Sequence, residues 1–439
     1  MKHLSPLRAR SLCAAVLIFG GCNAGGSPFA PSGSPTRSAS RPAQPSKAVE
    51  RVIYSFDQST GYRPAAGMLV DRTGALFGSS FRGGALDLGD VFKLTRHGKA
   101  YTENTLWNFG YGKDGTNPVA GLMEDASGAL YGTTEGGGAN PYGYGYGTVF
   151  KLTPSGSTYT ESVLWSFNGH DGEAPYAGLV SDHNGLLYGT TCCAGIHGGG
   201  TVFKLAPSGS RYIETVLWFF GNGQDGQNSY AGLLLKDGAL YGTAARGGSN
   251  ICNWYSNVGC GIVFKLTPHG KTYKEQILWN FGGTPDGSFP EAGLIADATG
   301  SLYGTTDSGG TYASGTVFKL TRNGKKYTES VLWSFGNGSD GRDPQGGLVA
   351  AASGALYGTT YTGGAYGNGS VFELLPSGSG YTERLLWSFL SGQDGALPQD
   401  GLVADKKGAF YGTTSFGGNS YTYSGGCAQG CGTVFEVRP

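Results

Sequence analysis

Four short segments follow one another in a fixed order: Leu164-Trp-Ser-Phe167, Ala177-Gly-Leu-Val180, Leu187-Tyr-Gly-Thr-Thr191 and Thr201-Val-Phe-Lys-Leu205. Each is rich in aromatic or β-branched residues and is bounded by Gly, Asp, Asn or Pro, which is typical of a β-strand. The last three segments recur seven times along the chain. The first has a degenerate copy at residues 54–56 and six complete copies, marked by Trp107, Trp165, Trp218, Trp279, Trp333 and Trp387.

Seven repeats of four strands predict an all-β fold, a seven-bladed β-propeller with four antiparallel strands per blade. A solenoid would need capping repeats at its ends. Here the chain enters on the fourth strand of a repeat, at residues 51–56, and ends on the third, at residues 433–437. We therefore expect the N-terminal strand to join three C-terminal strands and close the ring.

The complete unit contains Leu-Trp-Ser-Phe, Asp-Gly, Ala-Gly-Leu, Leu-Tyr-Gly-Thr-Thr and Gly-Thr-Val-Phe-Lys-Leu. It resembles the GloVer repeat, a Gloeobacter/Verrucomicrobia-type tandem repeat of exported bacterial β-propeller proteins. The resemblance covers residues 51–439. Because that family has no established activity, the resemblance implies repeat and export but no chemistry.

Composition agrees with many short strands joined by tight turns. Glycine supplies 81 of the 439 residues, and aromatic residues (13%) are almost as common as charged ones (14%). Disordered chains have few aromatic residues and high charge, so they are excluded. Basic and acidic residues balance at 31 each without a basic patch, which argues against nucleic acid as a partner.

The N-terminus has the pattern of an export signal. Lys2, Arg8 and Arg10 precede an apolar stretch at residues 12–19, which is too short to span a bilayer. Phe-Gly-Gly then precedes Cys22, as at a bacterial lipoprotein cleavage site. We expect residues 1–21 to be removed and Cys22 to be lipidated.

Three regions follow from this assignment: the lipoprotein-type signal peptide at 1–21, a flexible Ser/Pro/Gly-rich tether at 22–48 and the propeller at 49–439. The expected location is the bacterial cell envelope, with ordinary secretion as the alternative. If the cell has two membranes, Asn23 favours the outer one, since it replaces the Asp that signals inner-membrane retention. The membrane would be contacted only through the lipid anchor.

Loop lengths predict which face binds a partner. We name the strands A (Ala-Gly-Leu), B (Tyr-Gly-Thr), C (Val-Phe-Lys) and D (Leu-Trp-Ser-Phe). The spacing from strand B to strand C is 14, 18, 14, 22, 14, 14 and 23 residues, while the other spacings stay nearly constant. Because loops on a rigid scaffold carry function, we expect the face with the B–C and D–A loops to bind the ligand.

The three long B–C loops, at 131–149, 241–263 and 411–434, are rich in aromatic residues among Gly, Asn and Ser. Tyr and Trp offer a large contact area with a polar group at low entropic cost. The candidate ligand-binding residues are Trp254, Tyr255, Tyr142, Tyr144, Tyr146, Tyr421 and Tyr423. The alternative is that these aromatic residues pack their own loops.

Asp-Gly recurs in six D–A crossings, at Asp114, Asp171, Asp225, Asp286, Asp340 and Asp394. Six carboxylates around a ring could attract a cation. The recurrence in nearly every repeat favours a structural Asx-type turn instead. No standard calcium loop has this spacing, so we expect neither a metal nor any other cofactor.

Six cysteines remain after Cys13 and Cys22, and all lie in B–C loops. An even set in an exported protein indicates disulfides. The candidates are Cys252 with Cys260, Cys427 with Cys431, and the adjacent Cys192 and Cys193. The spacings do not match a zinc site.

These observations support three functional hypotheses. The leading one is a monomeric, non-catalytic binding module for a glycan or an extended peptide. The second is a carbohydrate-active hydrolase or lyase that uses Asp residues of the same face. The third is a structural or assembly subunit that contacts an envelope protein. The sequence contains no nucleophile elbow and no phosphate-binding loop in a strand–helix context.

Overall fold

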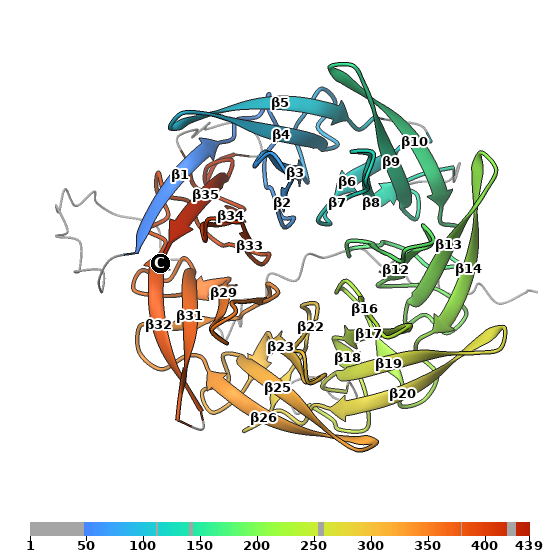
Figure 1. Cartoon of the computed structure of the whole chain (residues 1–439), viewed down its shortest axis with the longest axis vertical. Coiled ribbons are helices and arrows are strands. Elements are labelled where there is room, and N and C mark those ends of the chain that lie inside the picture. Colours follow the sequence, from blue (N-terminus) through green and yellow to red (C-terminus); the bar gives the residue numbers. More distant parts are fainter. Residues whose placement is uncertain (1–47, 111–112, 140–143, 253–258, 379, 419–426) are drawn as a thin grey trace, which may run out of the picture. The chain divides into compact units, whose positions relative to one another are not determined.

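The computed structural model describes residues 48–439, except 111–112, 140–143, 253–258, 379 and 419–426. The described part of the chain consists of strands and loops, and no helix in it is long and apolar enough to cross a membrane. The strands form seven antiparallel sheets arranged in a ring (Figure 1), which confirms the predicted seven-bladed propeller. The predicted signal peptide, the tether and Cys22 lie outside the described residues.

Each blade runs from a two- or three-residue inner strand A to a long outer strand D. Blades 1 to 4 contain β2 (Leu69–Val70), β3 (Leu76–Ser80), β4 (Asp90–His97) and β5 (Ala100–Asn108); β7 (Met123–Glu124), β8 (Leu130–Gly137), β9 (Thr148–Ser155) and β10 (Thr158–Ser166); β11 (Val180–Ser181), β12 (Leu187–Thr191), β13 (Thr201–Ser208) and β14 (Arg211–Phe219); β16 (Leu234–Lys236), β17 (Ala239–Ala244), β19 (Ile262–His269) and β20 (Thr272–Asn280). Blades 5 to 7 contain β22 (Ile295–Ala296), β23 (Leu302–Thr306), β25 (Thr316–Asn323) and β26 (Lys326–Ser334); β28 (Val349–Ala350), β29 (Leu356–Thr360), β31 (Ser370–Ser377) and β32 (Gly380–Ser388); β33 (Val403–Ala404), β34 (Phe410–Thr414), β35 (Thr433–Arg438) and β1 (Val49–Ser55).

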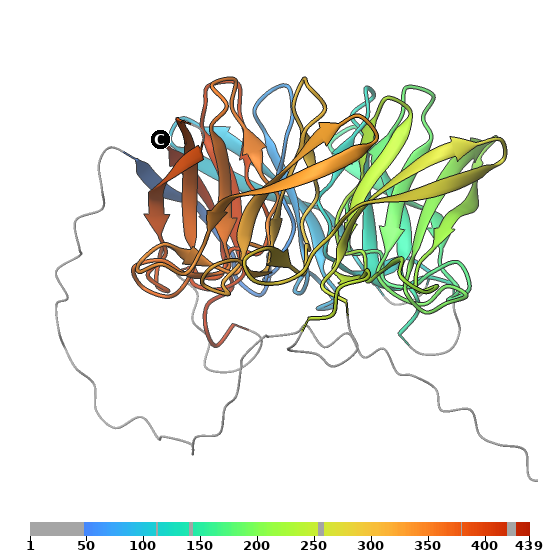
Figure 2. The ribbon, with the colours of Figure 1, turned by 90° about the horizontal axis from the view of Figure 1, so that it is seen from below.

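Short additional strands connect the D–A crossings to the beginnings of the B–C loops. These pairs are β6 (Gly115–Pro118) with β8, β15 (Gly226–Gln227) with β18 (Arg246–Gly247), β21 (Gly287–Ser288) with β24 (Ser308–Gly309), and β27 (Gly341–Arg342) with β30 (Thr362–Gly363). The crossings and the B–C loops therefore share one face of the ring. Figure 2 shows this loop face below and the strand hairpins above.

The last blade is closed as the sequence predicts. Strand β1 pairs antiparallel with β35, from Val49 opposite Arg438 to Ser55 opposite Thr433. The order of the closing sheet is β1-β35-β34-β33, so the two ends of the repeat region complete one blade. This pairing removes the open edge that would remain if the ring ended in a three-stranded blade.

Buried phenylalanines join each blade to the next. The phenylalanine at the end of strand D contacts the phenylalanine of strand C in the following blade, with ring centroids 5.0–5.1 Å apart. The seven pairs are Phe56–Phe92, Phe109–Phe150, Phe167–Phe203, Phe220–Phe264, Phe281–Phe318, Phe335–Phe372 and Phe389–Phe435. This interface explains why both aromatic positions recur in every copy of the repeat.

Hydrogen bonds also connect each blade to the next. In each blade the hydroxyl residue directly after the Tyr-Gly pair of strand B (Phe-Gly in blade 1) donates to a backbone carbonyl that precedes strand A of the next blade. The seven bonds, 2.8–3.4 Å long, are Ser79 to Ala120, Thr133 to Ala177, Thr190 to Ala231, Thr243 to Ala292, Thr305 to Gly346, Thr359 to Asp400 and Thr413 to Ala66. We call this the inter-blade ring. Its last bond joins blade 7 to blade 1, so it is continuous around the propeller.

Candidate functional site

A second set of positions lies beside the inter-blade ring, on the loop face. At each blade junction it contains two residues. One lies two positions after the hydroxyl residue of strand B that donates the inter-blade bond, and the other lies directly before the residue whose carbonyl accepts that bond. The facing pairs are Phe81/Val119, Glu135/Tyr176, Cys192/Tyr230, Ala245/Glu291, Asp307/Gln345, Tyr361/Gln399 and Ser415/Ala65. We call these residues the mouth ring. Unlike the inter-blade ring, it has a different pair of side chains at every blade junction.

The backbone holds the mouth ring in place. Each D–A crossing has, at the equivalent position, a non-glycine residue with a φ of 52–59°: Arg63, Asn117, Ala174, Asn228, Phe289, Asp343 or Leu397. Its carbonyl accepts the amide of the mouth residue after strand B in the same blade, as in Cys192 to Ala174 (3.2 Å). Non-glycine residues rarely adopt this left-handed conformation, and such backbone is concentrated at functional sites.

The mouth ring surrounds the central axis. In each pair, the residue that precedes strand A is partly exposed, and so is the glycine two residues after it. The residue between these two is buried in six of the seven blades. Neighbouring blades approach most closely at two of these glycines: a β-carbon on Gly178 would lie 2.9 Å from the carbonyl oxygen of Gly121, and one on Gly401 would lie 2.5 Å from that of Gly347. Solvent therefore reaches the mouth ring at the residues that precede strand A, whereas Phe81, Cys192, Ala245 and Ser415, which follow strand B, are buried.

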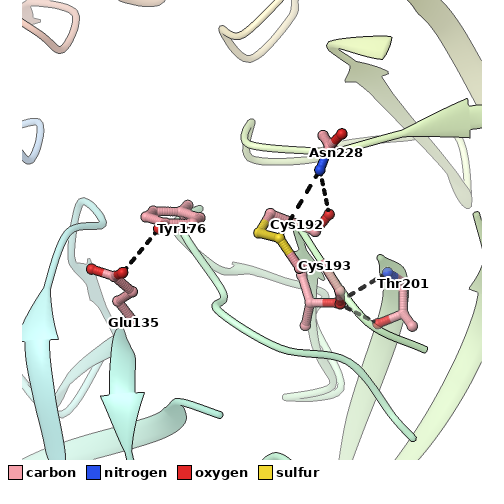
Figure 3. Close-up of a disulfide and its surroundings, with 7 residues drawn as sticks. Glu135, Tyr176, Cys192, Cys193, Thr201 and Asn228 are labelled. Carbon is pink, nitrogen blue, oxygen red and sulfur yellow. Dashed lines mark hydrogen bonds between the residues drawn. A yellow bond between two sulfur atoms is a disulfide. The ribbon is translucent and has the colours of Figure 1, made fainter. Parts of the chain in front are cut away.

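Glu135 and Tyr176 form one hydrogen-bonded pair across a blade junction. The Tyr176 hydroxyl donates to Oε1 of Glu135 at 3.0 Å, as Figure 3 shows. The Tyr176 ring also meets the ring of Tyr230 edge-on, with centroids 5.6 Å apart. Burial raises the pKa of Glu135, although the hydrogen bond from Tyr176 opposes the shift. Two aromatic rings and one oriented carboxyl group thus come together on blades 2 to 4.

A second carboxyl group occupies the corresponding position on blade 5. Nε2 of Gln345 donates to Oδ1 of Asp307 at 3.1 Å, and Oγ of Ser308 donates to Oδ2 at 2.9 Å. Burial raises the pKa of Asp307. The neighbouring Glu291 has its pKa raised to about 8, chiefly by burial and then by the charge of Asp307, whereas Arg246 lowers it. This side of the mouth ring is acidic.

Asp400 lies where the ring closes. Five other blades have alanine at this position and one has glycine. The Asp400 carboxyl group accepts the backbone amide of Gly67 in blade 1 and, at 2.6 Å, that of Gly401. Burial raises its pKa. These bonds assign Asp400 to closure of the inner ring, next to the mouth.

Three disulfides form as the sequence predicts: Cys192–Cys193, Cys252–Cys260 and Cys427–Cys431. The second and third close long B–C loops. The first joins adjacent residues at the mouth ring, where Nδ2 of Asn228 donates to the Cys192 carbonyl at 3.2 Å (Figure 3).

The aromatic residues of the long loops have varied positions. Tyr144 is 58% exposed and donates its hydroxyl to Oδ1 of Asn117 at 2.5 Å, while Tyr146 packs against a core cluster of blades 2 and 3. Both contacts lie within the scaffold. Tyr142, Trp254, Tyr255, Tyr421 and Tyr423 lie outside the described residues, so their role in binding stays a prediction.

The Asp-Gly aspartates accept hydrogen bonds within their own crossings. Asp171 accepts Trp165 Nε1 at 3.0 Å, the Asn168 backbone amide at 2.8 Å and Asn168 Nδ2 at 2.9 Å. The backbone amide four residues earlier bonds to Asp114, Asp225, Asp286, Asp340 and Asp394. These contacts correspond to the turn that the sequence favoured over a cation ring. Among the described residues, no group of three or more His, Cys, Asp or Glu side chains is placed to hold a metal ion.

Sequence reasoning missed the mouth ring because it compared loop lengths rather than the residues at equivalent repeat positions. The signal was present: the residue after Tyr-Gly-Thr-Thr is Glu, Cys, Asp, Tyr or Ser in different copies, whereas the Tyr-Gly-Thr-Thr segment before it hardly varies. A repeat holds its structural residues constant, so variation that begins directly after a constant strand segment indicates a surface that is free to specialise.

Comparisons with known proteins agree with this architecture. The Gloeobacter/Verrucomicrobia repeat matches residues 42–255 and 251–439. No curated protein matches the sequence.

Three solved structures with the same fold share 10–13% sequence identity with the chain. An ancestral GH74 enzyme has a TM-score of 0.56 over 87% of this chain and 48% of its own. The extracellular domain of a putative one-component system from B. thetaiotaomicron has a TM-score of 0.52 over 88% and 42%. A putative 6-phosphogluconolactonase from Bacteroides uniformis has a TM-score of 0.51 over 77% and 88%. At this identity the likeness shows the fold alone.

Proposed function

This chain belongs to the Gloeobacter/Verrucomicrobia repeat family. Because membership of that family implies the propeller but no activity, we propose a function from the candidate site. The protein is an exported, non-catalytic module that binds a glycan at the mouth ring. The lipid anchor at Cys22 and the position at the cell envelope belong to the same proposal. The ligand would enter from the loop face of the ring.

One observation carries this proposal: side chains that suit sugars occur at the mouth ring, directly beside strand segments that are nearly constant between repeats. Tyr176 and Tyr230 supply aromatic surface, and Glu135, Asp307 and Gln345 supply hydrogen-bonding groups. Ligand sites combine an apolar or aromatic wall with a few oriented polar groups. Sugar hydroxyls both donate and accept, so carboxylates and amides match them.

A glycan is favoured over an extended peptide by the shape of the site. A peptide would extend an exposed sheet edge or fill a long groove. The mouth ring instead surrounds an axis, and strand A of each blade is only two or three residues long. A compact sugar unit, or the end of a glycan chain, matches that geometry better.

A hydrolase is the second candidate, and one specific observation favours it. Glu291, with its pKa raised to about 8, would be protonated near neutral pH beside the carboxyl group of Asp307. Glycosidases use such a pair, with one protonated acid and one carboxylate. In that case Glu291 would be the general acid, and Asp307 would be the base or nucleophile.

A glycan array tests the proposal. The purified protein should bind a coherent set of glycans, and Tyr176→Ala should weaken that binding by about tenfold or more, because an aromatic contact residue is lost. Tyr312→Ala is the matched control, since Tyr312 is a 48% exposed tyrosine of another B–C loop outside the mouth ring. Unchanged binding by Tyr176→Ala would contradict the mouth-ring site.

An assay for new reducing ends on the bound glycans separates the two candidates. A binding module leaves the glycans intact. Release of reducing ends that is lost in Glu291→Gln would establish the hydrolase instead. If the folded protein binds none of the glycans, the glycan proposal is wrong, and capture of an envelope protein becomes the next hypothesis to test.

A further inference from the structure

The three disulfides differ in what surrounds them. Cys252 and Cys260 belong to a hydrophobic core cluster of blades 4 and 5, and Cys427 and Cys431 belong to a cluster at the closing blade. The Cys192–Cys193 disulfide belongs to none of the core clusters among the described residues, although Cys192 is buried. Cys193 is partly exposed. This disulfide therefore lies at the boundary between the scaffold and solvent.

Two segments of the mouth hold this disulfide. The backbone of Cys193 pairs with Glu173, with N–O distances of 3.0 and 3.3 Å, and the Cys192 amide donates to the Ala174 carbonyl at 3.2 Å. On the other side, Asn228 donates to the Cys192 carbonyl and reaches Sγ of Cys193 at 4.0 Å (Figure 3). Tyr176 and Tyr230 lie two residues beyond Ala174 and Asn228. The disulfide and the tyrosine pair thus belong to one wall of the mouth.

Stabilisation of the fold does not account for this disulfide. A cross-link stabilises a protein mainly by restricting the unfolded chain, and the effect grows with the length of the closed loop. Cys192 and Cys193 are adjacent, so the loop is the shortest that the chain can form. What the bond does restrict is local: it removes the freedom of two side chains and of the peptide between them at the start of a B–C loop.

The bond also changes the chemistry of the surface. Two free cysteines would present S–H groups that rotate and donate weakly. The disulfide presents a rigid, polarizable, largely apolar surface without a donor. It replaces the carboxyl groups that Glu135 and Asp307 supply at the equivalent position of blades 2 and 5.

We propose that the Cys192–Cys193 disulfide is a ligand-contacting wall of the mouth, against which the apolar C–H face of a sugar ring packs beside Tyr176 and Tyr230. This inference rests on the proposed glycan-binding function and names one contact surface for it. It also specifies the ligand class: a pyranose with a continuous C–H face toward blades 3 and 4 and with hydroxyl groups toward Glu135 and Asp307.

The test compares two double variants on a glycan that the parent protein binds. Cys192→Ala with Cys193→Ala should weaken binding by about tenfold or more, because a rigid contact surface is lost. Its melting temperature should stay within about 2 °C of the parent, since so short a loop adds little to stability. Cys427→Ala with Cys431→Ala should show the reverse: a lower melting temperature, because both residues are buried in a core cluster, and unchanged glycan affinity.

A chemical version uses the unaltered chain and avoids any folding defect of the variants. A water-soluble phosphine converts a disulfide into two thiols while the phosphine becomes its oxide, with the oxygen supplied by water. Brief treatment should reach the partly exposed Cys193 before the buried loop disulfides, and glycan affinity should fall in step with the first two thiols that appear. Unchanged affinity in both the variant and the reduced protein would overturn the proposed wall but leave glycan binding standing. A parent protein that binds no glycan would overturn both.

Discussion

Thr133 and Glu135 lie two residues apart on strand β8 and both face blade 3, yet they belong to regions of opposite character. Thr133 donates to the carbonyl of Ala177 at 3.2 Å, and Glu135 accepts from Tyr176 at 3.0 Å. Blade 5 repeats this arrangement with Thr305 and Asp307. The first position is occupied by serine or threonine in all seven blades, whereas the second is occupied by a different residue in each blade.

The difference teaches where this repeat can specialise. The inter-blade donor satisfies a buried backbone carbonyl, and any replacement without a hydroxyl would leave that carbonyl without its partner. The mouth residue is fixed by its backbone, while its side chain differs from blade to blade, and Glu135 and Asp307 are partly exposed. The same strand therefore carries one residue that maintains the ring and one that can be exchanged without loss of the ring.

The largest effect should come from a glycine on the same strand. In Gly132→Ala the new β-carbon would lie 2.5 Å from Cζ of Phe150 and 2.9 Å from Cδ2 of Leu122, so the variant should lose about 3 kcal/mol of unfolding free energy. Glu135→Gln is the matched control and should change that free energy by less than about 0.5 kcal/mol. Urea denaturation of both proteins provides the measurement. Equal losses of unfolding free energy in the two variants would contradict the distinction between scaffold residues and mouth residues.

A smaller loss should follow removal of one inter-blade bond. Thr190→Val deletes the 3.0 Å bond to Ala231 and leaves its carbonyl without this donor, at a cost of about 1–2 kcal/mol. Thr190→Ser should retain most of the stability, because Ser79 makes the same bond in blade 1. Thermal unfolding distinguishes the two variants. A valine variant as stable as the serine variant would show that the inter-blade ring contributes little to stability.

A dependence of stability on pH should arise at the outer strands. Burial, with a smaller contribution from an Asp-Gly aspartate, raises the pKa of Glu161, Glu275, Glu329 and Glu383 to about 7 and that of Glu214 to about 8. Between the unfolded pKa of about 4.3 and these values, the folded protein holds more protons than the unfolded chain, so stability falls as pH rises. The melting temperature should be several degrees lower at pH 8 than at pH 5.

Glu214→Gln sharpens this test, because it should raise the melting temperature more at pH 8 than at pH 5. Asp57, Asp71, Asp125 and Asp297 shift the other way: hydrogen bonds from their own turns lower the pKa of each. Their stabilisation is lost only below about pH 4, outside the tested range. A melting temperature that increases from pH 5 to pH 8 would contradict the assignment to the outer-strand glutamates.

Much of the fold could be predicted because the same pattern of strand segments occurs seven times in the sequence. Strand order, blade number and the closing pair of β1 and β35 follow from the spacing of the segments and from where the chain starts and stops within a repeat. The three disulfides could also be paired, since each joins cysteines close in sequence within one loop.

The candidate site could not be predicted as well from the sequence. Loop length pointed to the face on which the mouth ring lies but to other residues, and Tyr146 packs against the core. A pair such as Glu135 and Tyr176 is 41 residues apart, and each residue looks unremarkable in its own repeat. Only the ring places the end of one strand B next to the start of the following strand A.

The sequence by itself determined the architecture, because periodic burial of Phe, Leu and Val can be satisfied by only a few arrangements of seven four-stranded sheets. The tertiary structure decided which polar residues face one another, which disulfide lies outside the core and which carboxyl group closes the ring. The physical reason is that burial is a property of each repeat, whereas a binding site depends on distances between repeats, which arise only when the ring closes.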